Sequence, residues 1–456
     1  MDAVFSNLYQ RIVGWEQGAR NVPVTPRMSR REIREELAPL DFSRPYDLAD
    51  LVDRVANLLE KGAVHPNHPR YFGLFNPGVR RAGIVADALV ALYNPQMGGW
   101  WHAPAACEIE AHTLAHLARK IGLDPSASFA TFTTGGSEAN LTGVLCGLAH
   151  VFPGYAKGGV AASGNAPVFY GSDQAHDSFV KIARSTGLGE KAFRRVRSDA
   201  RQRLDVDDLR AAIARDRAEG KSPFLVVATV GTTSTGAIDP VADIASLCKD
   251  EGLWLHADAA WGGIALLSEA ARAHVADLAL ADSITWDAHK TFPVPMGAGM
   301  FFARTRAPSE AIFSVHTAYV PDAEPGTIDL YQQTIQWSRR FIGLKIFLTL
   351  AELGNAGMAK LVDHQMRMGV HLREALAGAG FRLTNDSPLP IACFAHEGRL
   401  PPAEIARRVA AEGHAWLSEV RLGNGAHWLR ACITHHDTGP EDIRQLVAAV
   451  QNITSV

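Results

Sequence analysis

Short apolar runs alternate with longer helix-like stretches between about residues 86 and 345, and this alternation constrains the fold more than any other feature of the sequence. Strands separated by segments long enough for a crossover helix are typical of βαβ units around a mainly parallel sheet. The sequence therefore predicts an α/β fold. The expected strands are Ser128–Thr133, Val168–Gly171, Phe224–Thr229, Leu253–Asp258, Ser283–Trp286 and Gly299–Ala303.

Two further zones flank this region. Residues 1–85 are charged and helical in pattern, then rich in proline and aromatic residues, with too little continuous apolar sequence for a core of their own. We expect them to form an N-terminal helical segment that packs on a partner subunit. Residues 86–345 would then form a large ligand-binding domain. Residues 346–456, with a strand expected at His427–Ile433, would form a small C-terminal α/β domain.

The charge balance and the cysteine pattern argue against several classes of protein. A formal net charge of −3 gives no electrostatic reason to expect nucleic acid or an anionic membrane as a partner. The five cysteines are scattered and include no C-x-x-C, which is typical of a reduced protein without disulfides. No apolar run approaches the roughly 18 residues of a membrane span, and no signal-peptide pattern begins the chain. We therefore expect a cytoplasmic protein.

A glycine-rich turn follows the first expected strand. In open α/β sheets, ligands bind outside the carboxyl ends of the strands, so the position of a residue adds information to its type. After Thr133, two glycines allow a tight turn, and a helix begins near Ser137. Free amide groups and the positive end of the helix dipole would make this turn a phosphate site. The alternative is an ordinary helix N-cap.

An aspartate ends the otherwise apolar strand at 253–258. An unpaired charge there would be costly, and a ring nitrogen that must stay protonated would be a suitable partner for Asp258. The small side chain of Ala260 would leave room for a flat ring. The alternative is a structural aspartate that caps the following turn.

Two basic residues follow other strands. Lys290 comes just after the strand at 283–286, where desolvation would favour the neutral amine, a nucleophile for carbonyl groups. His176 follows the strand at 168–171. Taken alone, each could be an ordinary surface or hydrogen-bonded residue. Their order along one α/β core, however, fits a cofactor with a phosphate, a flat ring, a pyridine nitrogen and an aldehyde.

These motifs resemble those of the pyridoxal-phosphate-dependent group II decarboxylases, which include aromatic-amino-acid, glutamate, cysteine-sulfinate and diaminobutyrate decarboxylases. The resemblance runs from about Pro66 to Thr438. It includes the segments Trp100–Glu110, Thr229–Asp239 and Arg339-Arg340-Phe341. It implies the aspartate-aminotransferase-like fold (fold type I), pyridoxal 5′-phosphate as cofactor in the domain at 86–345, and a homodimer.

The resemblance also implies roles for the candidate residues. Lys290 would carry the cofactor as a Schiff base, Asp258 would pair with the ring nitrogen, and His176 would stack on the ring. Arg430 resembles an arginine that can meet the substrate carboxylate. Trp101 and His102 fall where the family shapes the side-chain pocket. The remaining expected cofactor contacts are Gly136, Ser137 and His289 at the phosphate, and Thr229 and Ala260 at the ring.

Two features depart from the family pattern. The family's catalytic loop carries a tyrosine that protonates the substrate carbon, but Leu330 occupies that position here. We take residues 314–333 as the loop and the adjacent Tyr331 as the candidate proton donor, with Tyr319 further upstream. In addition, residues 297–299 read Gly-Ala-Gly where many members have Cys-Gly or Cys-Ser.

The predicted function is decarboxylation of an L-amino acid to the amine and CO₂, with a preference for an aromatic or bulky side chain. The loop departure leaves open an aldehyde synthase, an oxidase or a carbon–carbon lyase. A non-catalytic pyridoxal-binding protein is a third hypothesis. We expect no metal site, because the pair His112 and His116 lacks the Glu of H-E-x-x-H and a third ligand.

Overall fold

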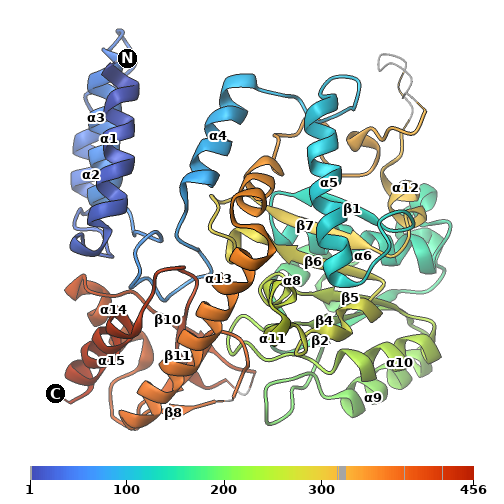
Figure 1. Cartoon of the computed structure of the whole chain (residues 1–456). Coiled ribbons are helices and arrows are strands. Elements are labelled where there is room, and N and C mark those ends of the chain that lie inside the picture. Colours follow the sequence, from blue (N-terminus) through green and yellow to red (C-terminus); the bar gives the residue numbers. More distant parts are fainter. Residues whose placement is uncertain (1–2, 316, 318–324, 385, 424, 456) are drawn as a thin grey trace.

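A seven-stranded sheet lies at the centre of the protein, with the strand order β1-β7-β6-β5-β4-β2-β3 (Figure 1). The computed structural model describes residues 3–455 except 316, 318–324, 385 and 424, so Tyr319 lies outside the described residues. The strands are β1 (Phe129–Thr133), β2 (Pro167–Ser172), β3 (Phe193–Val196), β4 (Ser222–Thr229), β5 (Trp254–Asp258), β6 (Ser283–Asp287) and β7 (Gly299–Ala303).

The predicted α/β fold with a mainly parallel sheet is confirmed. Strands β3, β2, β4, β5 and β6 pair in parallel, whereas β7 is antiparallel to both β6 and β1. Every strand expected in this region is present, with each end within two residues of its expected position, the usual spread of strand ends. Strand β3 was not predicted. It is a short edge strand whose central residues are the polar Arg194 and Arg195.

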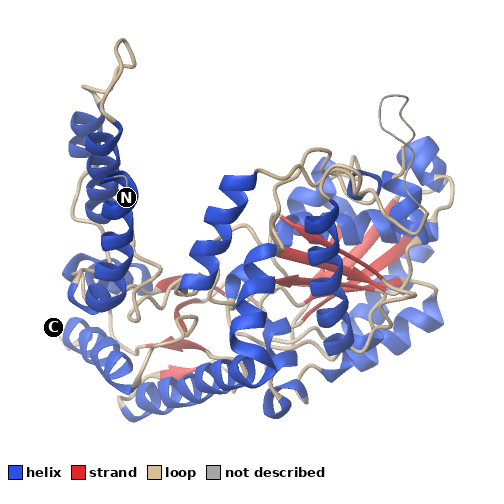
Figure 2. Ribbon diagram, turned by 45° about the horizontal axis from the view of Figure 1, so that its top comes forward, coloured by secondary structure: helices blue, strands red, loops and turns tan. Residues whose placement is uncertain are grey.

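Helices cover both faces of this sheet (Figure 2). Alternate residues of β4 belong to different cores: Val226 and Ala228 to one, Leu225 and Val227 to the other. Both faces of the strand are therefore buried, which explains why it is apolar throughout. The helices in contact with the sheet include α5 (Pro104–Ile121), α6 (Gly136–Val151), α8 (Ser178–Ser185), α9 (Val206–Ala218) and α10 (Val241–Glu251). Shorter helices are α7 (Tyr155–Gly158), α11 (Glu269–Arg272) and α12 (Ala307–Phe313).

A second, antiparallel sheet follows in the C-terminal part, with the order β10-β11-β9-β8. Its strands are β8 (Arg382–Leu383), β9 (Ile391–Ala395), β10 (Ser418–Arg421) and β11 (His427–Cys432), and β11 confirms the strand expected there. The helices α14 (Pro402–Glu412) and α15 (Pro440–Thr454) pack beside it and share a separate apolar core with it. The long helix α13 (Leu344–Gly378), which is kinked at Gly354, contacts α5 as well as β9 and therefore links the two sheets.

The N-terminal helices stand beside the two sheets rather than on either of them (Figures 1 and 2). They are α1 (Ala3–Gly18), α2 (Arg30–Leu37) and α3 (Leu48–Gly62), and α4 (Arg81–Tyr93) then packs along α13. Neither α2 nor α3 contains a buried residue. Among the described residues, no helix combines the length and the apolar character that crossing a bilayer would need.

Candidate active site

A cavity of about 280 Å³ lies where the strands of the large sheet end. Strands β1, β2, β4, β5 and β6 run in the same direction, so the residues that follow them meet at one edge. All the residues expected to bind the cofactor line this cavity: Gly136, Ser137, His176, Thr229, Asp258, Ala260, His289 and Lys290. The structure thus brings together side chains that are far apart in the sequence.

The turn between β1 and α6 presents free backbone donors to the cavity. Helix α6 begins at Gly136 without a side-chain cap. The amide groups of Gly136 and Ser137 have no hydrogen-bond partner among the described residues. A Cβ atom at Gly136 would lie 2.8 Å from Oδ2 of Asp287, and one at Gly299 would lie 2.6 Å from Cα of Gly135. Glycine at both positions therefore permits a close-packed turn that suits an anionic group.

The imidazole of His289 is held in one orientation at the side of this turn. Its Nδ1 accepts the Ala298 amide at 3.0 Å, and its own amide donates to the Ala298 carbonyl at 3.2 Å. Burial lowers the pKa of His289, so the ring is neutral and carries its proton on Nε2. The segment 297–299, where the sequence departs from the family pattern, is therefore the support of His289.

The carboxylate of Asp258 is buried at the end of β5 and receives two hydrogen bonds. The Ala260 amide donates to Oδ1 at 3.1 Å, and Nδ2 of Asn140 donates to Oδ2 at 3.0 Å. Two hydrogen-bond donors, one on each oxygen, thus hold a carboxylate that lines the cavity. This arrangement can hold a proton on a ring nitrogen by charge attraction.

Lys290 has a charged neighbour that we had not expected. Its Nζ lies 3.1 Å from Oδ2 of Asp287, and the aspartate side chain is only 1% exposed. Desolvation was the only environmental effect expected at Lys290, whereas the structure places a buried carboxylate beside its amine. Asp287 ends β6 as Asp258 ends β5, and that shared strand-end position was the signal in the sequence that could have identified it.

The cavity wall retains polar atoms without partners. Oγ1 of Thr229 and Oδ1 of Asp287 are buried and have no hydrogen-bond partner in the part of the chain that the structure describes. Leaving such groups unpaired costs free energy, so their presence in a cavity wall favours a polar ligand. His176 is exposed to the cavity, and its Nδ1 accepts the Ser178 amide at 3.1 Å. That bond places the proton of the neutral ring on Nε2.

The residues expected to contact the substrate do not line the cavity of this chain. Arg430 on β11 lies directly behind the cavity wall. Its Nη1 donates to the Thr233 carbonyl at 2.8 Å, and its Nη2 donates to the Gly73 carbonyl. Its Cζ lies 5.1 Å from the ring centre of Phe75. Thr233 and Phe75 themselves line the cavity. Arg430 therefore contacts two residues of the cavity lining but does not line the cavity itself.

Tyr331 and the 96–102 segment pack against each other. The Tyr331 amide donates to the Gly98 carbonyl at 2.8 Å, and its hydroxyl accepts a hydrogen bond from Gln332 at 2.9 Å. Trp101 and His102 are exposed and make an edge-to-face ring contact at 5.2 Å. Leu330 lines a different cavity.

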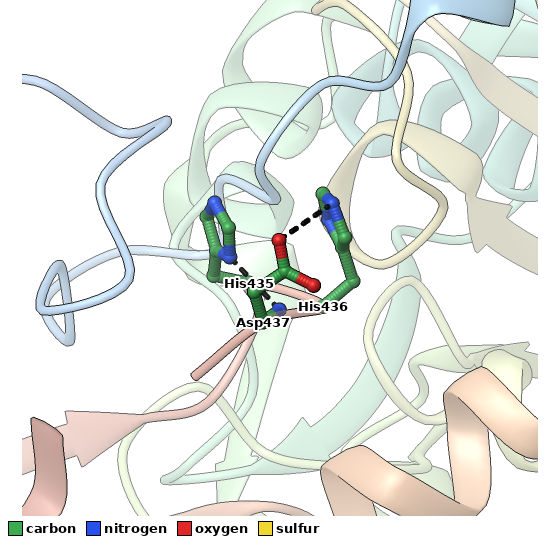
Figure 3. A group of neighbouring side chains, drawn as sticks. All are labelled: His435, His436 and Asp437. Carbon is green, nitrogen blue, oxygen red and sulfur yellow. Dashed lines mark hydrogen bonds and ion pairs between the residues drawn. The ribbon is translucent and has the colours of Figure 1, made fainter. Parts of the chain in front are cut away.

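One group of side chains in the described part of the chain lies within metal-ligand distance, namely His435, His436 and Asp437 (Figure 3). Both ring nitrogens of His435 are engaged: Nδ1 accepts the Asp437 amide at 3.0 Å, and Nε2 meets the Asn67 carbonyl at 3.1 Å. The two histidine rings stack at 4.6 Å. Because His435 has no free lone pair in this arrangement, the group is explained as hydrogen-bonded structure.

The fold and the cavity define a class of enzyme that uses pyridoxal phosphate, and the comparisons with known proteins agree. Residues 31–397 match the family model described as the pyridoxal-dependent decarboxylase conserved domain, so the chain belongs to this family. It is a pyridoxal-phosphate-dependent amino-acid decarboxylase of fold type I. The cavity fits the cofactor, because it offers free amides for the phosphate, a carboxylate for the ring nitrogen and an amine for the aldehyde.

Two relatives and one solved structure illustrate the similarity. An aromatic-L-amino-acid decarboxylase of Bacillus atrophaeus is 29% identical over 453 residues, covering 95% of this chain and 91% of the relative. An L-2,4-diaminobutyrate decarboxylase of Rhizobium meliloti (strain 1021) is 32% identical over 321 residues, covering 69% of this chain and 63% of the relative. The crystal structure of Oryza sativa TDC with PLP and tryptamine superposes with a TM-score of 0.91 at 22% identity, covering 99% of this chain and 97% of that one.

Proposed function

We propose that this enzyme converts an L-amino acid with an aromatic or otherwise bulky side chain to the amine and CO₂. The observation that carries the proposal is the convergence, in one cavity, of the Lys290 amine, the Asp258 carboxylate and the free amides at the start of α6. Pyridoxal phosphate supplies the electron sink that accepts the electron pair of the broken Cα–carboxylate bond.

Each residue of the cavity then has one task. Lys290 would hold the cofactor covalently through its amine, and the Asp287 carboxylate, 3.1 Å from Nζ, keeps that side chain in place. Asp258 keeps the proton on the ring nitrogen, and His176 covers the ring. The amides of Gly136 and Ser137 bind the phosphate. These contacts orient the reacting bond and leave the side chains with little to rearrange.

Aromatic residues around the cavity support the preference for a bulky substrate. Phe75 and Trp261 both line it, and their ring centres lie 4.3 Å apart. Arg430 behind Phe75 is bonded only to backbone carbonyls, which a substrate carboxylate can replace as a stronger, charged acceptor. The two relatives named above carry different substrates in their names, so the preference depends on the cavity itself.

We further propose a homodimer in which residues 1–85 pack on the partner subunit. The N-terminal helices expose large apolar side chains, and Phe42 is 90% exposed. Trp101 and His102 are exposed next to the loop and would border the active site of the partner. The interface should reach about 2,000–5,000 Å², the range of obligate dimers. Light scattering that detected a stable, active monomer at micromolar concentration would disprove this arrangement.

A second candidate function is an aldehyde synthase, an oxidase or a carbon–carbon lyase. It is favoured by one observation: no tyrosine occurs among the described residues that line the cavity, and the hydroxyl of Tyr331 is bonded to Gln332 elsewhere. Without a proton donor, the substrate carbon stays open to oxygen or to another bond cleavage. A non-catalytic pyridoxal-binding role would account for Lys290 and His176, which hold the cofactor, but not for the Asp258 carboxylate, whose charge serves the electron sink.

Product analysis tests these alternatives. The purified enzyme is incubated with a panel of L-amino acids, and CO₂, amine, aldehyde, ammonia and peroxide are measured. The proposal predicts equal amounts of amine and CO₂, formed fastest from aromatic substrates. Aldehyde, ammonia and peroxide formed at the rate of CO₂ would establish the second candidate. Cofactor binding without turnover of any substrate would establish the third.

A further inference from the structure

A chain of buried hydrogen bonds runs from the amino end of β5 to the carboxylate at its carboxyl end. Nε1 of Trp254 bonds to Oγ of Ser283 at 2.8 Å, and that hydroxyl bonds to Nδ1 of His256 at 2.8 Å. Nε2 of His256 bonds to Oδ1 of Asn140 at 3.0 Å, and Nδ2 of Asn140 bonds to Oδ2 of Asp258 at 3.0 Å. The chain ends at the proposed partner of the ring nitrogen.

The donors and acceptors of this chain all point in one direction. An indole N–H can only donate, so the Ser283 hydroxyl accepts from Trp254 and donates to Nδ1 of His256. The proton of the imidazole is then on Nε2, where it is donated to the Asn140 carbonyl oxygen. A flipped Asn140 amide would place its oxygen against the Asp258 carboxylate, with two acceptors facing each other. Burial lowers the pKa of His256 to about 4, which keeps this ring neutral, and the hydrogen bonds to Ser283 and Asn140 set its tautomer.

The secondary structure explains why these groups line up. Residues 254, 256 and 258 alternate along β5 and therefore face the same side of the sheet, toward α6. Asn140 lies in the second turn of α6, whose amino end borders the cavity. The helix approaches closely because a Cβ atom at Gly143 would lie only 2.5 Å from the His256 ring. The chain is thus sealed between helix and sheet, and His256 has no exposed surface.

We propose that Asn140 and His256 are positioning residues that fix the Asp258 carboxylate for the ring nitrogen of pyridoxal phosphate. This inference rests on the proposed role of Asp258. Without the Asn140 donor, the Ala260 amide, on the other oxygen, is the remaining hydrogen-bond partner of the carboxylate among the described residues. The carboxylate then turns away from the position that keeps the ring nitrogen protonated, and the electron sink weakens.

The test measures the protonation of the ring nitrogen directly. The enzyme is loaded with ¹⁵N-labelled pyridoxal phosphate, and the ring-nitrogen resonance is recorded by NMR for the native protein, Asn140→Leu and His256→Leu. We expect the native signal to be that of a protonated pyridine and both variants to shift toward the unprotonated value. We expect kcat to fall about tenfold or more in Asn140→Leu, the scale of one lost hydrogen bond to a charged group, and less in His256→Leu, which leaves that bond in place.

Conservative and matched variants separate positioning from packing. The amide N–H of Gln can replace Nε2–H of histidine, so His256→Gln should restore most of the native resonance. Trp254→Phe removes a donor of the chain, whereas Trp286→Phe removes an equally buried indole whose Nε1 has no partner. Only Trp254→Phe should move the signal. Circular dichroism identifies any variant that fails to fold. If the leucine variants do not fold, the resonances of His256→Gln and Trp254→Phe decide whether the hydrogen-bond chain positions Asp258.

Asp258→Asn in the same experiment distinguishes the two possible failures. If Asp258→Asn shifts the resonance but Asn140→Leu and His256→Leu do not, the positioning inference is wrong and the proposed role of Asp258 stands. If Asp258→Asn itself leaves the native signal unchanged, the proposed role of Asp258 is wrong, and the inference fails with it.

Discussion

The two sides of the active site are built differently. On the sheet side, Asp258 ends β5 and His289 lies just after β6, and both are fixed by hydrogen bonds from backbone amides. On the outer side, Tyr331, Trp101 and His102 belong to connecting segments and lie outside the cavity of this chain. All the residues proposed to bind the cofactor line one cavity of a single chain, whereas the residues proposed to contact the substrate do not line it.

The largest effect is expected on the sheet side, from Lys290→Ala. This substitution removes the amine that holds the cofactor while the phosphate and ring contacts remain. Turnover, measured as CO₂ release, should fall by about 10⁴-fold or more, the scale seen when a covalent catalyst is lost. Circular dichroism should show an intact fold. Lys360→Ala, at an exposed position on α13, is the control and should keep native turnover. Substantial CO₂ release by Lys290→Ala would contradict the assignment.

The second prediction concerns the contact between Glu110 of α5 and the segment 339–343, which follows the loop. Arg339, just after the loop, is buried and donates to Glu110 of α5 at 2.5 Å, while the other Glu110 oxygen accepts the amides of Ile342 and Gly343. Glu110→Ala should reduce the free energy of unfolding by about 3–5 kcal/mol, because it leaves a buried guanidinium unpaired. Urea denaturation measures this. A loss below about 1 kcal/mol would mean that this anchor contributes little.

A third change on the sheet side removes the charge of Asp258 and, because an amide has only one oxygen, one of the two hydrogen bonds that the carboxylate accepts. Asp258→Asn keeps the shape of the side chain but loses the charge that favours a protonated ring. We expect kcat to fall about a hundredfold, on the scale of one electrostatic partner of a transition state, with the cofactor still bound. Steady-state kinetics and the visible absorbance of the bound cofactor provide the two readings. Turnover close to the native rate would show that Asp258 has another task.

The smallest expected effect is a change of products rather than of rate. If the loop moves over the cavity and Tyr331 supplies the proton, Tyr331→Phe should divert products from the amine toward aldehyde, ammonia and peroxide, with CO₂ release little changed. If the native enzyme already forms aldehyde, Leu330→Tyr should restore some amine. An unchanged product ratio in Tyr331→Phe would place the proton donor elsewhere, with His176 the next candidate.

The same contrast describes what could be predicted from the sequence. Strands such as β4 were recognised because burial on both faces makes them apolar throughout, and Asp258 stood out as a charge at the end of such a strand. The contact of Asp287 with Lys290 was not predicted, because it depends on the conformation of the short turn that joins them. The reversed direction of β7 could not be predicted, because an apolar run carries no information on strand direction.

Contacts between elements that are far apart in the sequence could not be predicted either. The bond between Asn140 and His256 depends on how closely α6 approaches β5, and that distance is set by the small Gly143. Similarly, Arg430 was expected at the substrate, but its bonds to the carbonyls of Gly73 and Thr233 follow from how the two sheets dock. Sequence patterns define the elements and their ends, whereas packing decides which ends meet.

Borohydride reduction tests the central claim most directly. Reduction of the purified, cofactor-loaded enzyme should fix pyridoxal phosphate irreversibly to the protein, and peptide mass spectrometry should locate the adduct. The account predicts a single modified peptide that contains Lys290, with loss of the visible absorbance. In Lys290→Ala no adduct should form. A stoichiometric adduct on any other lysine of the native enzyme would contradict the account.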